Sequence, residues 1–213
     1  KKAKLIYDAH ELESNKNGQT KLMSLGTLFI EKKSWKYIDL LISVSNSILK
    51  WYSKNIGHKK NILVLNSPLI SMRRDSFNKI ESHDNSYFNN LYGISNDCLI
   101  FIYIGYLTKG RGINQIIDIF DDRDIKSHVI FLGDGDLKDF IVKASKINHK
   151  IHYHEPVKHD WVVEISKSAD VGLCLVENIS LSDYYCLPNK LFEYAFSNLP
   201  ILSSDFPELK KII

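Results

Sequence analysis

Short apolar runs alternate with amphipathic segments along the first third of the chain. Three of these runs are rich in Ile, Leu and Val and predict buried strands over 4–7, 39–44 and 61–65. Between them, apolar residues recur at helical spacing and predict helices over 21–37 and 45–55, with Ser45 as an N-cap. Strands alternating with helices are typical of a parallel, doubly wound sheet.

A second, longer series follows after a polar stretch. The stretch 69–96 predicts a linker with one short helix near 87–92. Beyond it, the pattern predicts strands over 98–104, 128–132, 151–153, 171–176 and 201–203, and helices over 113–120, 136–146, 160–167, 188–197 and from 207 onward. About five strands, each followed by a helix, approach a complete Rossmann-like unit. The sequence therefore predicts an α/β protein with an incomplete first domain over 1–68, a linker over 69–96 and a second domain over 97–213.

The segment LPNKLFEYAFSNLP, residues 187–200, predicts a helix with an unusual start. Pro188 suits the first helical position. Lys190 then falls in the first turn, where the helix dipole disfavours a cation unless an anion is bound there. Glu193 has the reach to accept hydrogen bonds from hydroxyls beside that anion. At helical spacing, the apolar side of this helix carries Leu191, Phe192, Ala195 and Phe196. A Lys190–Glu193 surface pair on an ordinary amphipathic helix is the alternative interpretation.

Composition narrows the class of protein. An apolar content of 44% supports a core, and a net charge of +3 is too weak to indicate nucleic acid. The charge is compatible with anionic ligands or lipid headgroups. The three cysteines lack metal-type spacing, and two lie in apolar runs, which indicates reduced thiols of a cytosolic protein. No apolar run is long enough for a spanning helix.

The loops after the strands of the second series hold the candidate chemistry, because parallel sheets bind ligands there. The loop GYLTKGRG, residues 105–112, opens a helix and combines glycines with Lys109 and Arg111, which favours phosphate. The loop is close to the P-loop motif, but Arg111-Gly112 occupies the two positions where that motif requires Lys followed by Ser or Thr. This difference excludes a nucleoside triphosphatase. A glycine-rich turn with two solvated cations is the alternative.

Other polar loops give weaker indications. Asp134 and Asp136 are interpreted as turn and cap residues rather than metal ligands. His152 and His154 lack a well-spaced third ligand for zinc, so no metal site is predicted, and these histidines and His159 are interpreted as solvated or capping. The backbone at Glu155–Val157 is free to meet a flat base, and the loop 177–186 offers hydroxyl, carboxylate and aromatic groups suited to a sugar. In the first series, His10 and Glu11 follow a strand and would face a cleft.

These motifs resemble glycosyltransferase family 4, whose members are retaining enzymes of the GT-B fold that use nucleotide-activated sugars. The resemblance rests on PNKLFEY, LPILSSDFPEL, ADVGLCL, GYLTKGRGINQII and IFLGDGD in the second series, and on DAHE, DLLISVS and VLNSP in the first. It covers nearly the whole chain. It implies a GT-B protein truncated at both ends, with part of the acceptor domain followed by most of the donor domain.

The resemblance also implies roles for individual residues. Those that would hold the donor diphosphate are Lys109 or Arg111, Lys190 and Asn189. Glu193 would hold the ribose hydroxyls, and His10 would face the donor sugar as the catalytic residue. The loops beside the base and sugar would contribute Gly133, Glu155, Pro156, Val157, Asp183 and Tyr185. The sequence departs from the family at Tyr185, where a glutamate is usual, and at Tyr106, where many members have an arginine.

The function implied is transfer of a sugar, with retention and without a metal or other cofactor, from a nucleotide-diphosphate donor to a saccharide or lipid-linked acceptor. The PNK form of the motif points to cell-surface polysaccharide biosynthesis. The expected location is the cytoplasm, with peripheral contact at the inner face of the membrane, and the fragment alone is expected to be inactive. Two alternatives remain: a GT-B nucleotide-sugar 2-epimerase, and a non-catalytic nucleotide-sugar-binding pseudoenzyme, which Tyr185 favours.

Overall fold

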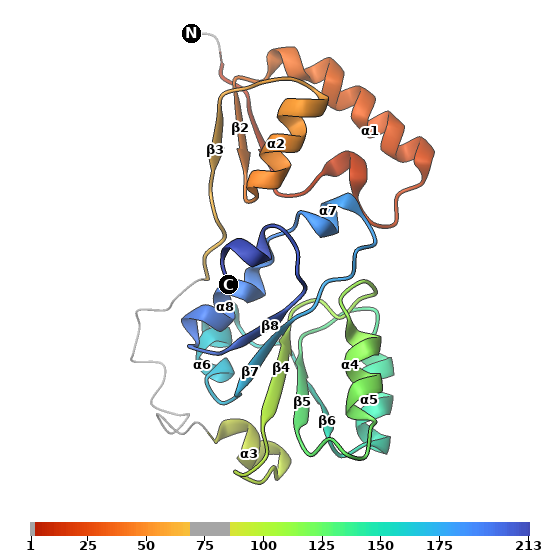
Figure 1. The fold of residues 1–213 in the computed structure, drawn as a ribbon, viewed down its shortest axis with the longest axis vertical. Coiled ribbons are helices and arrows are strands. Elements are labelled where there is room, and N and C mark those ends of the chain that lie inside the picture. The colour runs from red at the N-terminus through yellow and green to blue at the C-terminus, as the bar shows by residue number, and fades with distance from the viewer. Residues whose placement is uncertain (1–2, 69–85) are drawn as a thin grey trace. The chain divides into compact units, whose positions relative to one another are not determined.

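Two compact units make up the computed structural model, which describes residues 3–68 and 86–213 (Figure 1). Unit 1 comprises Lys1–Asn66, Val176–Leu187 and Ser204–Ile213, and unit 2 comprises Ser67–Leu175 and Pro188–Ser203. Among the described residues, no helix has the length and apolar character needed to span a membrane.

This division differs from the predicted domain boundary, because Val176–Leu187 and Ser204–Ile213 group with unit 1. Hydrogen bonds between distant parts of the chain hold both segments there. The Leu12 N–H donates to Ser182 Oγ at 3.1 Å, and the Asn46 N–H donates to the Glu208 carboxylate at 3.1 Å. Periodicity along the sequence does not reveal such contacts. Most of the predicted linker lies outside the described residues, and its short helix, Tyr87–Tyr92, belongs to unit 2.

Unit 1 is built on a three-stranded parallel sheet in the order β1-β2-β3. Its strands are β1 (Ile6–Ala9), β2 (Leu40–Ser43) and β3 (Asn61–Leu63), and its helices are α1 (Lys21–Ser34), α2 (Asn46–Asn55) and the short α7 (Leu181–Tyr184). Three 3₁₀ turns cover Glu13–Asn15, Trp35–Tyr37 and Leu209–Lys211. The Ser45 hydroxyl caps α2 as predicted. Helix α7 falls in a predicted loop, and Ser180 caps it by accepting from the Asp183 N–H.

Helix α1 turns part of its apolar surface outward. Leu22, Phe29 and Ile30 are 82%, 62% and 65% exposed. The inner side of the helix carries Glu31, which is buried and accepts hydrogen bonds from the hydroxyls of Tyr7 and Tyr52. A buried carboxylate therefore anchors this helix to the unit 1 core in place of an apolar stripe.

Unit 2 is a five-stranded parallel sheet in the order β6-β5-β4-β7-β8. Its strands are β4 (Ile100–Ile104), β5 (His128–Leu132), β6 (Ile151–His154), β7 (Val171–Cys174) and β8 (Ile201–Ser203). Its helices are α3 (Tyr87–Tyr92), α4 (Ile113–Phe120), α5 (Lys138–Ile147), α6 (Val162–Ser166) and α8 (Asn189–Phe196), and a 3₁₀ turn, His159–Trp161, precedes α6.

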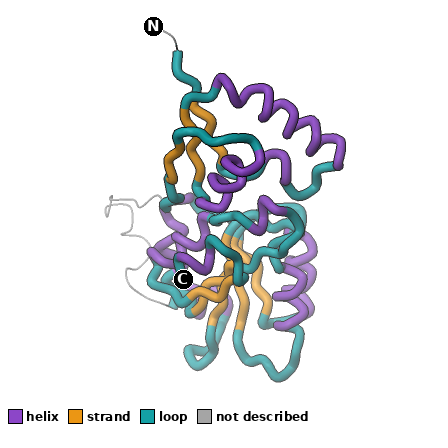
Figure 2. The backbone as a smooth tube through the Cα atoms, turned by 45° about the horizontal axis from the view of Figure 1, so that its top comes forward, coloured by secondary structure: helices purple, strands orange, loops and turns teal. Residues whose placement is uncertain are grey.

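The sheet of unit 2 lies between helices on both faces (Figures 1 and 2). Residues of α4 and α5 pack with Tyr103, Val129 and Phe131 in one apolar cluster. On the other face the Tyr194 ring of α8 lies against Gly172 of β7. The strand order reverses between β4 and β7, which makes the carboxyl ends of these strands the topological switch point. The predicted doubly wound fold is confirmed.

A pair of histidines joins the first residue of β5 to the second residue of β6. The nitrogens His128 Nδ1 and His152 Nε2 lie 2.9 Å apart, and the two rings stack. Burial lowers the pKa of both imidazoles, that of His152 to about 4. Burial of the two neighbouring rings disfavours a positive charge on either of them.

Acidification is therefore expected to destabilise unit 2. The unfolded chain binds protons at these histidines below about pH 6.5, whereas the folded pair resists protonation, so stability falls as the pH drops from about 6.5 towards 4. Urea unfolding at pH 7.5 and pH 5 should show a lower midpoint at the lower pH. The drop should shrink in His152→Gln. An equal drop in the variant would show that other groups cause it.

Candidate functional site

Two glycine-containing loops approach each other backbone to backbone at the switch point of unit 2. A Cβ built on Gly133 would lie 2.0 Å from the carbonyl oxygen of Gly105, and one on Gly135 would lie 2.5 Å from that of Leu107. The Leu107 N–H donates to the Asp134 carbonyl at 2.8 Å. Only glycine fits such contacts. The backbone of the loop after β5 therefore packs directly against the loop 105–112, which was predicted to bind phosphate.

Lys190, in the first turn of α8, lies beside the phosphate loop. Its Nζ is 3.3 Å from the centroid of the Tyr103 ring, and its Cε is 3.6 Å from the Cβ position of Gly105. A cation over an aromatic face is held by the ring quadrupole. This contact fixes the ammonium group at the carboxyl end of β4, next to the start of α8, where the free helix N–H groups lie.

Arg111 brings a second positive charge to the same place. Burial raises the pKa of the Cys174 thiol, the last residue of β7, to about 11, while the charges of Lys190 and Arg111 act on this thiol in the opposite direction. The Arg111 charge also acts on the Tyr103 hydroxyl. Of the two predicted alternatives, Lys109 and Arg111, it is the Arg111 charge that acts on Cys174 and Tyr103 beside Lys190, which favours Arg111.

Glu193 follows one turn after Lys190 and is only 5% exposed. Burial raises the pKa of its carboxyl group, and the charges of His159 and Lys190 partly oppose that rise. The His159 Nδ1 lies 3.7 Å from Glu193 Oε1. A buried carboxylate beside two cationic or ionisable groups can accept hydrogen bonds from neutral hydroxyls without full exposure to water.

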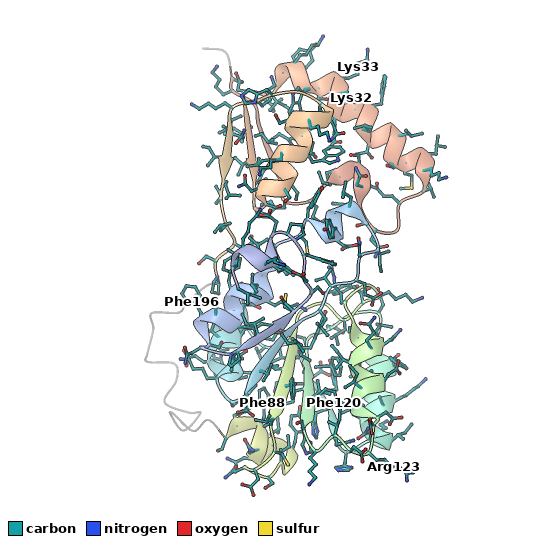
Figure 3. The ribbon with its side chains drawn as sticks, viewed as in Figure 1. Lys32, Lys33, Phe88, Phe120, Arg123 and Phe196 are labelled. Atoms are coloured by element: carbon teal, nitrogen blue, oxygen red, sulfur yellow. The ribbon has the colours of Figure 1, made fainter. Side chains whose placement is uncertain are left out.

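The buried side of α8 differs from the predicted one. Leu191 is buried as expected, but Ala195 is exposed and Phe196 is 50% exposed (Figure 3). Tyr194 is fully buried instead, and its hydroxyl accepts from the Ile104 N–H at 3.0 Å and lies 3.1 Å from the carbonyl oxygens of Ile102 and Leu173. Strands β4 and β7 separate beyond the pair Ile102 and Gly172, so backbone groups there have no partner in the neighbouring strand. The Tyr194 hydroxyl fills this gap and bonds them, which explains why tyrosine is the buried residue.

Among the other residues predicted in unit 2, Asp136 and Glu155 have local partners. Asp136 accepts hydrogen bonds from the hydroxyls of Tyr106 and Thr108, which ties the two glycine-containing loops together. Glu155 is exposed and forms an ion pair with Lys138 at 3.0 Å. The other two residues of that loop are Pro156, exposed, and Val157, partly buried, while Asn189 is exposed at the start of α8. No group of three possible metal-ligating side chains occurs within the described ranges.

Three predicted site residues belong to unit 1. The exposed His10 lies 3.2 Å from Asp8 through its Nε2. Asp183 is buried and accepts from the Ser180 hydroxyl at 2.8 Å at the start of α7. Tyr185 packs against the apolar core of unit 1. Unit 2 alone brings together Lys190, Arg111 and Glu193.

Sequence reasoning missed Tyr103 and gave His159 no role in the site. Tyr103 lies under Lys190, two residues before Gly105 at the end of a strand. An aromatic ring inside an apolar strand carries no signal of its own, because the same ring is expected in a core. His159 was interpreted as solvated or capping, and the structure places it beside Glu193.

Comparison of the fold with known structures identifies GT-B glycosyltransferases as neighbours. HepE of Anabaena, solved with UDP and glucose, superposes with a TM-score of 0.72 at 12% identity, over 99% of this chain and 55% of HepE. WaaG, a glycosyltransferase of lipopolysaccharide biosynthesis, gives 0.65 at 14% identity, over 98% and 58%. TarM of S. aureus gives 0.63 at 13% identity, over 96% and 37%.

These similarities establish a GT-B type fold for the chain. Neither the family models nor the curated proteins contain a match to the sequence. The chain spans little more than half the length of HepE and WaaG.

Proposed function

We propose that this chain is part of a retaining glycosyltransferase of family 4 and that unit 2 binds its nucleotide-diphosphate sugar. One observation carries the proposal: Lys190 and Arg111 converge with buried Glu193 at the switch point between β4 and β7. HepE, which shares the fold, was solved with UDP-glucose. The proposed acceptor is a saccharide or lipid-linked saccharide of cell-surface polysaccharide biosynthesis, on the cytoplasmic side of the membrane.

The roles of the residues follow from charge. Lys190 and Arg111 would neutralise the diphosphate as it departs, together with the N–H groups at the start of α8. Because these cations supply the positive charge, we propose that transfer needs no metal. Glu193 would accept hydrogen bonds from the two ribose hydroxyls. His10 of unit 1 is the proposed residue facing the donor sugar.

Lys190→Ala is expected to weaken UDP binding about tenfold while uridine binding changes little. The lost interaction is a charge-assisted bond to phosphate, which contributes about 1.5 kcal/mol. Calorimetric titration of the whole chain with UDP and with uridine measures both. Lys146→Ala, which removes an exposed charge from the last turn of α5, is the matched control. Equal weakening of both ligands by Lys190→Ala would contradict the phosphate assignment.

Glu193→Gln is expected to weaken UDP binding severalfold and to weaken binding of 2′-deoxy-UDP by a smaller factor. A neutral amide accepts hydrogen bonds less strongly than a carboxylate, and the deoxy ligand lacks one of the hydroxyls concerned. Competition titrations with the two nucleotides measure the difference. If the variant loses the same affinity for both, Glu193 supports the fold and not the ribose.

A non-catalytic nucleotide-sugar-binding protein is the second candidate, and Tyr185 is the observation that favours it. This tyrosine stands where the family usually has a glutamate, and its ring packs on the unit 1 core. A chain that binds UDP-sugar without hydrolysing or transferring the sugar would support this candidate.

A further inference from the structure

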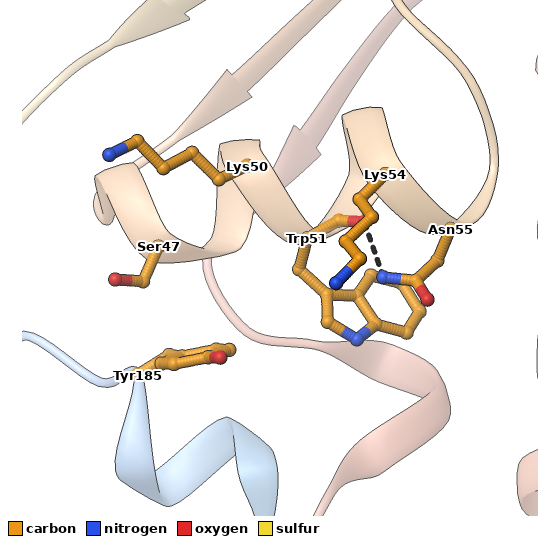
Figure 4. A pocket seen from close by; sticks show the side chains of 6 residues that line it. All are labelled: Ser47, Lys50, Trp51, Lys54, Asn55 and Tyr185. Carbon is orange, nitrogen blue, oxygen red and sulfur yellow. Dashed lines mark hydrogen bonds between the residues drawn. The ribbon is translucent and has the colours of Figure 1, made fainter.

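A pocket lies on the surface of unit 1, along helix α2 (Figure 4). The cavity measures about 370 Å³ and is lined by Ser47, Lys50, Trp51, Lys54, Asn55 and Tyr185. Five of these residues come from α2, and Tyr185 comes from the segment Val176–Leu187 of the same unit. Its volume suits a small ligand such as one sugar ring with a substituent.

Two lysines, Lys50 and Lys54, line this pocket, and in Figure 4 the Lys54 side chain lies beside Trp51 while the Lys50 ammonium group points away from it. Lys50 and Lys54 are four residues apart on α2, so their side chains project from the same side of the helix. Both are exposed, and neither forms an ion pair with the described part of the chain. Like charges at this spacing repel and weaken a helix. An anion held between them would remove that repulsion.

The pocket also presents two aromatic rings held in place by the core. Trp51 meets the buried Tyr52 edge to face, with the ring centroids 5.2 Å apart, and Tyr185 meets Tyr184 at 5.5 Å. Both residues are only partly buried, so each keeps accessible ring surface. Rigid, partly exposed aromatic rings suit the apolar face of a sugar ring, because little entropy is lost when the sugar packs there.

Polar groups complete the lining. The Asn55 Nδ2 donates to the Trp51 carbonyl at 2.8 Å, which orients the amide and leaves its oxygen as an acceptor (Figure 4). The Ser47 hydroxyl donates to Glu208 at 2.6 Å. That carboxylate also forms an ion pair with Lys211 and receives the first N–H groups of α2. Its charge is therefore already compensated and does not cancel Lys50 and Lys54.

We propose that this pocket binds an anionic saccharide, with its sugar ring against Trp51 and Tyr185 and its negative group between Lys50 and Lys54. The negative group is a carboxylate or a phosphate, because both accept hydrogen bonds from ammonium groups. Binding here does not depend on the donor site of unit 2. The identification of this anionic saccharide as the acceptor of the glycosyltransferase rests on the proposed function.

The test is titration of the whole chain with glucuronic acid, glucose 1-phosphate, glucose and inorganic phosphate, followed by calorimetry and tryptophan fluorescence. We expect at least one of the two charged sugars to bind at least tenfold more tightly than glucose and inorganic phosphate, and to change the emission of Trp51. Lys50→Ala/Lys54→Ala should weaken that binding at least tenfold. The matched control, Lys32→Ala/Lys33→Ala, removes two exposed charges from α1 of the same unit and should leave it unchanged. Which charged sugar binds more tightly identifies the anionic group.

Several results would overturn the proposal. These are equal binding of glucose and the charged sugars, equal weakening by the two double variants, or an unchanged fluorescence response in Trp51→Phe. Titration with UDP distinguishes failure of this proposal from failure of the proposed nucleotide site in unit 2. Lys190→Ala should weaken UDP and leave the charged sugar unaffected, and the Lys50/Lys54 variant should do the reverse. A chain that binds the charged sugar but no nucleotide would refute the donor site and keep this pocket.

Discussion

Replacing Gly133 with alanine is expected to lower the free energy of unfolding of unit 2 by about 3 kcal/mol or more. The new Cβ would lie 2.0 Å from the Gly105 carbonyl oxygen, an overlap that both backbones would have to relieve. Neither is free to move, since the Gly105 N–H donates to Leu132 at 3.0 Å and the Gly133 N–H donates to His154 at 3.2 Å. Overpacking and the unfavourable backbone angle, φ +151°, each contribute about 1–3 kcal/mol.

Gly93→Ala separates the two contributions. Gly93 also has a positive φ, +66°, but nothing lies within 4 Å of its Cβ position. This variant should lose only about 1–2 kcal/mol, from the left-handed backbone alone. Urea unfolding with hydrogen exchange of each unit measures both variants. Similar losses in the two would show that the loops after β4 and β5 can separate without penalty.

The Gly133 variant also tests the donor site. Lys190 lies against the Gly105 backbone, so displacing that loop should weaken UDP binding even at temperatures where the variant remains folded. A folded variant with normal UDP affinity would show that the phosphate loop does not contribute to the nucleotide site.

Much of the fold follows from local pattern. The strands His128–Leu132 and Ile201–Ser203 and the helix Tyr87–Tyr92 have the predicted bounds. These segments are short apolar runs or patterned stretches that local sequence is enough to predict. Helix α7 was missed, because one turn of four residues capped by a serine has too few positions to show a period.

Tertiary contacts determine two features of the fold that the sequence pattern did not predict: the unit to which the C-terminal segment belongs and the buried side of α8. The return of Ser204–Ile213 to unit 1 depends on the Glu208 carboxylate at the start of α2, more than 160 residues earlier in the chain. Helical periodicity of α8 favoured Phe196 as a core residue, yet the core takes Tyr194. An apolar scale ranks phenylalanine above tyrosine and does not register that a gap between two strands needs a hydroxyl.

Sequence predicted those candidate site residues whose charge and position in the chain both indicate a phosphate site. Lys190 is a cation at a helix start and Arg111 belongs to a glycine-rich loop, and both lie at the switch point. Tyr103 and His159 gave no such signal, since a strand tyrosine and a surface histidine are common in any α/β protein. Their importance depends on proximity to Lys190 and Glu193, which only the folded chain creates.

Tyr194→Ala is expected to destabilise unit 2 by about 4 kcal/mol or more. The ring fills space against Gly172, where a Cβ would lie 2.4 Å from the ring, so its removal leaves a cavity as well as losing apolar burial. The hydroxyl accepts from the buried Ile104 N–H and lies within hydrogen-bond distance of two carbonyl groups. Deleting it leaves that backbone N–H without a partner where water has no access.

Tyr194→Phe isolates the hydroxyl, because it keeps the ring and removes only the oxygen. We expect a loss of about 1–3 kcal/mol, the penalty for an unpaired buried donor. Tyr106→Phe is the matched control: its hydroxyl bonds Asp136 at an exposed position, where water replaces the lost bond. Urea unfolding, with exchange of the Ile104 amide hydrogen as a local probe, measures the effect. If Tyr194→Phe is as stable as Tyr106→Phe and the Ile104 amide stays protected, then β4 and β7 close the gap without the hydroxyl, and the core choice of Tyr194 over Phe196 needs another cause.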